Sequence, residues 1–126
     1  HPTRLRRKHD LGNCEIRWLT QTVGAGNLDP SRVNSISAAI SSFLERHTDA
    51  LVLLDGLEYI LENNQITKVI GMLEGISQRV IAYGACMICA VTEEALDART
   101  LSLLSRVLEK PPQSTGDVMA RKLDEF

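Results

Sequence analysis

Apolar residues along this chain fall into short unbroken runs separated by segments of helical spacing. The central run, Leu51 to Leu54, stops at Asp55 and Gly56. A short apolar run that ends at turn residues is typical of a strand buried on both faces of a parallel sheet. Ala85 to Val91 forms a second run of this kind. We therefore predict buried strands at 51–55 and 85–91.

Three segments show the period of amphipathic helices, with apolar residues recurring every three or four positions. The predicted helices span 31–47, 65–82 and a last segment that Thr92 or Asp97 caps and Lys110 ends. Asp29 is expected to cap the first helix, with Pro30 in its first position. Gly84 is expected to end the second. A short helical turn is predicted from Gly56 to Leu61.

The order of these elements predicts an α/β fold. Glu15 to Thr20 alternates, which adds a first strand. Strand, helix and strand in alternation favour right-handed crossovers and a parallel sheet in the order 15–20, 51–55, 85–91. We expect a Rossmann-like or RecA-like three-layer sandwich. Three strands are few for such a sheet, so we expect it to be incomplete or to be completed by a partner strand.

Composition fits one domain of the soluble globular class. The 126 residues are 44% hydrophobic and 24% charged. We divide them into a basic arm (1–13), an α/β domain (14–110) and a tail (111–126). No apolar run reaches the roughly 18–20 residues that span a bilayer. Three cysteines do not suggest a disulfide framework, which favours a cytoplasmic location.

The basic arm carries Arg4, Arg6, Arg7 and Lys8. Such residues could contact phosphates of nucleic acid or lipid. The net charge of -2 and the absence of interleaved aromatic residues argue against nucleic-acid binding. A solvated arm, or contacts with acidic residues of the domain, is the favoured interpretation. We keep the three arginines as candidate interaction residues.

Several motifs, taken in order, resemble the domain-of-unknown-function 835 family, which occurs largely in archaeal proteins, often beside sensory modules. The resemblance covers roughly residues 2–109, and the family domain is longer at its start. The motifs are Trp18-Leu19-Thr20, Asp29-Pro30, Leu53-Leu54-Asp55-Gly56-Leu57-Glu58-Tyr59-Ile60, Asn63-Asn64 and Leu103-Leu104-Ser105-Arg106. Ile66 departs from the family, which often has Phe there.

The resemblance implies a relative of RecA/KaiC-type ATPase cores that lacks a working phosphate loop. Residues 51–55 would be its Walker B strand, and the phosphate-loop strand would lie before residue 1. Asp55 and Glu58 could then bind magnesium and position water. No G-x-x-x-x-G-K-[ST] motif occurs in the chain. We therefore favour Asp55 as a cap of the turn at Gly56, Glu58 as a solvated acid, and no cofactor.

Cys86 and Cys89 have the spacing of a metal or redox motif. On a strand, however, side chains three positions apart point to opposite faces. The two thiols therefore cannot share a metal ion or form a disulfide, and we expect them to pack as small apolar residues.

The 85–91 strand is expected at the edge of the sheet, although it has no Lys, Pro or inward charge to protect it. We expect the same strand of a second copy to cover it, antiparallel about a twofold axis, with the tail 113–126 as the competing cover. The candidate contacts are Ala85, Met87, Ile88 and Val91. The predicted function is a non-catalytic, signalling-associated module for protein–protein interaction or self-association. The alternative is a degenerate nucleotide-binding ATPase remnant using Asp55.

Overall fold

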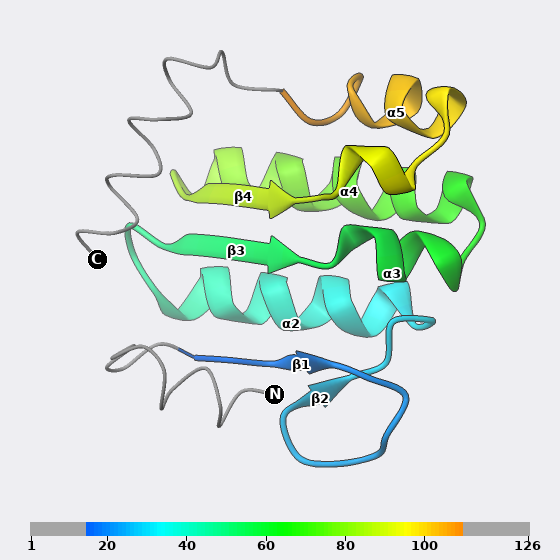
Figure 1. Cartoon of the computed structure of the whole chain (residues 1–126). Coiled ribbons are helices and arrows are strands. Elements are labelled where there is room, and N and C mark those ends of the chain that lie inside the picture. The colour runs from blue at the N-terminus through cyan, green and yellow to red at the C-terminus, as the bar shows by residue number, and fades with distance from the viewer. Residues whose placement is uncertain (1–14, 110–126) are drawn as a thin grey trace.

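A computed structural model of the chain describes residues 15–109. It has a mixed α/β architecture (Figure 1). The elements are β1 (Trp18–Leu19), β2 (Asn27–Leu28), α2 (Val33–Arg46), β3 (Leu51–Asp55), α3 (Leu57–Glu62), α4 (Ile66–Ala82), β4 (Cys86–Ala90), the 3-10 turn η1 (Glu93–Ala95) and α5 (Ala98–Leu104). No helix within residues 15–109 is long and apolar enough to cross a membrane.

β3 and β4 form a parallel two-stranded sheet. Its register runs from Leu51 opposite Cys86 to Asp55 opposite Ala90. The two predicted central strands, the helix that joins them and their parallel pairing are confirmed. The predicted third strand of this sheet is not: β1 pairs with β2 in a separate sheet, over two residues in each strand.

A tight return of the chain after β1 explains this difference. Residues 21–26 fold back so that Asn27–Leu28 lies beside β1. The amide of Thr20 donates to the carbonyl oxygen of Leu28 at 2.8 Å, and Gly26 takes a φ of 79° that favours glycine. β1 thus finds its backbone partners locally, and no hydrogen bond of the described ladders joins it to β3.

Helices α2 and α4 pack on each other and cover one face of the β3–β4 sheet. Leu54 is buried against them, and Val52, Met87 and Cys89 pack against the same core. The core residues are Val33, Ile36, Ile40, Leu44, Ala50, Leu54, Leu57, Ile60, Val69, Met72, Leu73, Ile76 and Leu104.

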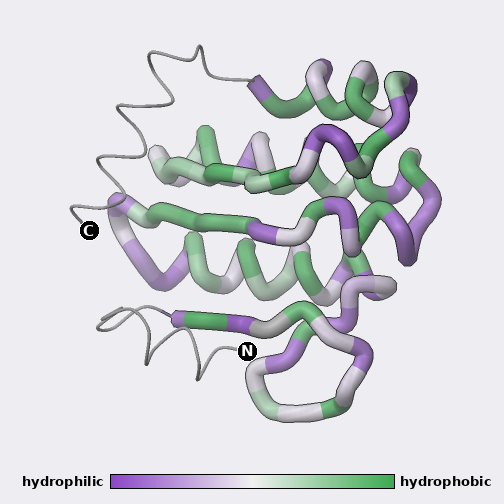
Figure 2. Tube along the Cα trace, viewed as in Figure 1, coloured by the Kyte–Doolittle hydropathy of each residue, from purple (hydrophilic) through white to green (hydrophobic). Residues whose placement is uncertain are grey.

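The other face of the sheet is not covered by the described residues. Leu53 is 57% exposed and Leu51 36%, although β4 and the part of β3 before Asp55 are hydrophobic (Figure 2). The prediction of strands buried on both faces was therefore wrong, and the described helices do not form the third layer of a sandwich. The physical reason is that α2 and α4 lie on the same side, so that one helical layer covers one set of alternating side chains.

Of four predicted helix ends, two are confirmed and two are wrong. The last helix was expected to end at Lys110, but α5 ends at Leu104, because the amides of Val107 and Leu108 both donate to the carbonyl oxygen of Leu104 and form a turn. Asp97 caps α5 by accepting the amide of Thr100 at 2.7 Å, and Gly84 ends α4.

Asp29 was wrongly predicted as a cap. Its carboxylate accepts the amide and hydroxyl hydrogens of Ser31, at 2.9 and 2.7 Å, and α2 begins only at Val33. Aspartate readily forms this local turn, and the carboxylate is then no longer available to the helix.

Candidate interaction surface on the β3–β4 sheet

Asp55 lies at the carboxyl end of β3, where ligands of parallel α/β sheets bind. It is exposed, and Gly56 after it takes a φ of 88° and begins α3 without a side-chain cap. The predicted capping role of Asp55 was therefore wrong. Gly56 makes the turn through its own backbone freedom, and the amide of Tyr59 finds the carbonyl oxygen of Gly56 at 2.9 Å.

Glu58 lies one turn further, half-buried in α3. It was predicted to be a solvated acid. Its Oε2 atom is instead buried and accepts no hydrogen bond from residues 15–109. Glu58 borders a hollow of about 170 Å³ that is lined by residues of α3, η1 and α5 and by Ile66, the first residue of α4. The sequence predicted neither this hollow nor the buried Oε2 atom of Glu58.

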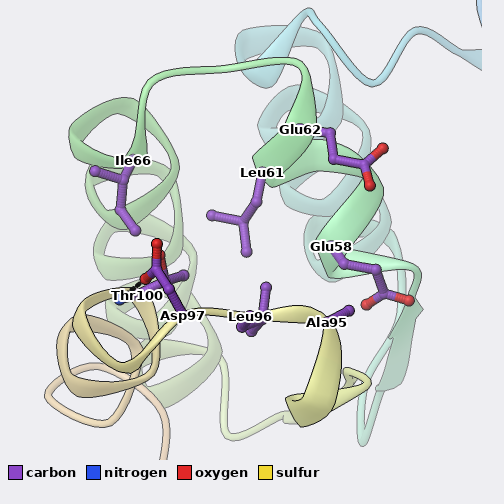
Figure 3. A pocket seen from close by; sticks show the side chains of 8 residues that line it. All are labelled: Glu58, Leu61, Glu62, Ile66, Ala95, Leu96, Asp97 and Thr100. Carbon is purple, nitrogen blue, oxygen red and sulfur yellow. Dashed lines mark hydrogen bonds between the residues drawn. The ribbon is translucent and has the colours of Figure 1, made fainter.

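The acids around this hollow do not converge on one point (Figure 3). Leu61 points toward Leu96 in the middle, Glu58 and Glu62 lie on one side, and Asp97 lies on the other. Asp97 is engaged by the amide of Thr100, which holds the pKa of its carboxyl below the usual value. Within residues 15–109, no cluster of three or more potential ligands could hold a metal ion.

The two cysteines of β4 occupy different environments. Cys86 is exposed, whereas Cys89 packs against the core. Burial raises the pKa of the Cys89 thiol to about 11. Both are free thiols, as the alternation of a strand requires. The expectation that both cysteines pack as small apolar residues is therefore confirmed for Cys89 and wrong for Cys86, which lies on the surface.

The outer face, as we call it, is the uncovered side of the sheet formed by Leu51, Leu53, Cys86 and Ile88. Leu51 pairs with Cys86 and Leu53 with Ile88, so the four side chains adjoin across the two strands. Leu51, Leu53 and Cys86 are exposed and Ile88 is half-buried. Adjoining exposed apolar side chains are typical of interaction sites in soluble proteins. The sequence carried no signal for it, because an apolar run without polar alternation does not reveal which face a helix layer will cover.

The β4 edge is the side of that strand turned away from β3. The amide of Cys86 donates to the carbonyl oxygen of Ala50, at 3.0 Å, on the β3 side. Backbone groups alternate in direction along a strand, so those of Met87 and Cys89 face the edge. Within the described part of the chain β4 pairs with β3 alone. Among the described strands, β4 is therefore an edge strand, as predicted.

The comparison with known families agrees with the motifs noted above. The profile of a family described as "Protein of unknown function (DUF835)" matches residues 1–108. The chain belongs to the DUF835 family. No curated protein and no solved structure was found to be similar to it. The DUF835 match establishes the family, and the description of the family states no function.

The structure brings together four of the predicted interaction residues of this DUF835 domain. Met87 and Ile88 lie in β4, and Ala85 and Val91 flank it. Arg4, Arg6 and Arg7 lie outside the described residues. Asp55 and Glu58 lie at the carboxyl end of the same sheet. Of the four, Ile88 lies on the outer face, whereas the side chains of Ala85, Met87 and Val91 pack against the core.

Proposed function

We propose that this domain is a non-catalytic, signalling-associated module for protein–protein interaction, and that it binds by accepting a further strand along the β4 edge. The observation that supports this most directly is that, within residues 15–109, β4 pairs with β3 alone. Met87 and Cys89 direct backbone donors and acceptors to the β4 edge, and Ala85 to Val91 contains no charged residue, proline or glycine.

The properties of unpaired sheet edges favour strand addition at β4. A row of unpaired N–H and C=O groups is a template for another strand, and proteins that avoid such pairing place Lys, Pro or a bulge there. None of these devices occurs in residues 85–91. Peptide recognition by strand addition uses the same backbone groups for affinity. A two-stranded sheet also gains stability from a third strand.

A synthetic peptide tests the edge as a strand acceptor. The probe is a fluorescent peptide of residues 84–92 with lysines added at both ends for solubility, titrated into the full chain. Met87→Pro removes an amide that faces the edge and leaves the pairing with β3 intact. Met87→Ala shortens the same side chain but keeps the amide. We expect binding to the wild type and to Met87→Ala, and loss of binding with Met87→Pro.

Circular dichroism of both variants checks that the helices persist. Equal binding by Met87→Pro and the wild type, or no binding by any form, would refute the strand-accepting edge. Protection of the Met87 and Cys89 amides from hydrogen exchange upon peptide addition would place the peptide on this edge.

A second candidate function is a degenerate nucleotide-binding remnant using Asp55. The observation in its favour is the half-buried Glu58, whose Oε2 atom lacks a partner among the described residues, one turn after Asp55. Calorimetry with ATP, with and without magnesium, tests it. Submillimolar, magnesium-dependent binding that Asp55→Asn abolishes would favour this candidate over the interaction module.

A further inference from the structure

The chemistry of the β4 edge identifies the strand that it accepts. Seven consecutive residues, from Ala85 to Val91, are uncharged. A strand that carries charges would find no complementary group along this stretch. A second copy of the same stretch meets it without like-charge contact and with apolar side chains on both faces. Two copies of the β4 edge can therefore pair with each other.

Twofold symmetry limits how two such edges can pair. The twofold axis stands perpendicular to the sheet and reverses the strand, so the pair is antiparallel. Residues that lie opposite each other must direct their side chains to the same face. Met87 can therefore lie opposite the partner subunit's Met87 or Cys89 across the two strands. Ile88 can lie opposite the partner subunit's Ile88.

One of these registers pairs the whole uncharged stretch. With Ile88 opposite the partner subunit's Ile88, Met87 lies opposite the partner subunit's Cys89, and Ala85 opposite the partner subunit's Val91. Met87 and Cys89 are the residues whose backbone groups face the edge. They form hydrogen-bonded pairs in both copies. A long side chain then packs beside a short one on the core side of the joined sheet.

We infer that the β4 edge binds the β4 edge of a second copy, antiparallel and centred on Ile88, to form a continuous four-stranded sheet. This inference rests on the proposed strand-accepting function and adds the partner and the register. In this arrangement the outer faces of the two copies are continuous, because the axis keeps each face on its own side of the sheet.

The register places Cys86 opposite the partner subunit's Ala90. The two form a non-hydrogen-bonded pair, in which the Cα atoms of antiparallel strands lie about 4.5 Å apart. This distance falls within the range of disulfides. In the wild type, Cys86 and the partner subunit's Cys86 are separated by four residues along the strands, at least about 13 Å, and cannot be bridged.

Cross-linking tests the register in the full chain with Cys14→Ser as background. Ala90→Cys should convert the chain into a covalent dimer under mild oxidation, linked to the native Cys86. Adding Cys86→Ser should abolish the link. Ile88→Cys, which introduces a thiol on the axis, should give a covalent dimer even with Cys86→Ser. Leu53→Cys is the matched control, because Leu53 is 57% exposed on the same face but lies on β3. It should remain unlinked.

Several outcomes would overturn this inference. One is a chain that stays monomeric in light scattering. Another is a dimer that is linked by Leu53→Cys and not by Ala90→Cys, which would move the contact to the outer face. Cross-linking that appears only when the chain is shortened to end at Lys110 would assign the edge to residues 111–126. If the peptide binds but Ala90→Cys does not link, the strand-accepting function stands and the second copy is excluded.

Discussion

The side-chain amide of Asn64 donates to the carbonyl oxygen of Pro30 at 2.7 Å, across 34 positions of the sequence. The same Nδ2 atom donates to the carbonyl oxygen of Ile60 at 2.9 Å. Pro30 is buried just before α2, and Asn64 lies in the turn between α3 and α4. One amide group therefore connects the start of the first long helix to the turn before the second.

Asn64→Ala should lower the free energy of unfolding by about 1–2 kcal/mol, because it leaves a carbonyl oxygen in a part-buried region without its donor. Urea denaturation measures this. Asn63→Ala is the control: its amide donates to the carbonyl oxygen of Tyr59 and its Oδ1 accepts from the Gln21 side chain at 3.3 Å, both at exposed positions. An equal loss in both variants would show that the connection to Pro30 adds nothing.

Gly75 lies inside α4 and Gly84 follows it, and replacing each by alanine should change stability in opposite directions. Gly84 has a φ of 63°, and the amides of Gly84 and Ala85 donate to the carbonyl oxygens of Ile81 and Val80, which closes the helix in a Schellman motif. Gly84→Ala should cost about 1–2 kcal/mol through its left-handed backbone alone, since nothing lies within 4 Å of the added Cβ.

Gly75 lies inside α4, also with nothing within 4 Å of an added Cβ. Gly75→Ala should therefore stabilise the protein by up to about 1 kcal/mol. Thermal or urea unfolding of both variants checks the opposite signs. A destabilised Gly75→Ala would contradict the open space around this position.

Stability should depend on the ionisation of Asp97. The hydrogen bond from the Thr100 amide holds the pKa of Asp97 below its usual value of 3.8. A lowered folded-state pKa means that the stabilisation is complete above the ordinary value and is lost as pH falls through the folded one. Asp97→Asn retains a capping oxygen but does not titrate there.

We expect the stability difference between wild type and Asp97→Asn to be constant near neutral pH. It should shrink as pH falls below about 4. Urea denaturation at several pH values measures it. A difference that stays constant down to strongly acidic pH would contradict the charged cap. Asp29, whose pKa is also lowered, chiefly by the Ser31 hydroxyl, can be replaced in the same way to separate the two contributions.

Asp55→Asn should change the free energy of unfolding by less than about 0.5 kcal/mol, as for an exposed residue without a specific partner. The change removes no capping bond, because α3 has no side-chain cap. The purified chain should not hydrolyse ATP. Turnover that Asp55→Asn abolishes would contradict the interaction module as the function.

The central strand pair and its helices could be predicted because their signals are local. The run Leu51 to Leu54 and the helical spacing of 65–82 each encode one element, and the caps at Gly84 and Asp97 follow from single residues. Asp29 misled because two local uses of a carboxylate compete, and the turn at Ser31 prevailed over the helix cap.

The sequence by itself determined the strand–helix–strand unit, its parallel sense and an uncharged strand at an edge. Only the tertiary structure decided which face of that unit is covered. Both helices lie on one side, so Leu54 is buried and Leu53, the adjacent residue, is 57% exposed. An apolar run gives both residues the same signal, because burial depends on the layer that packs against each face.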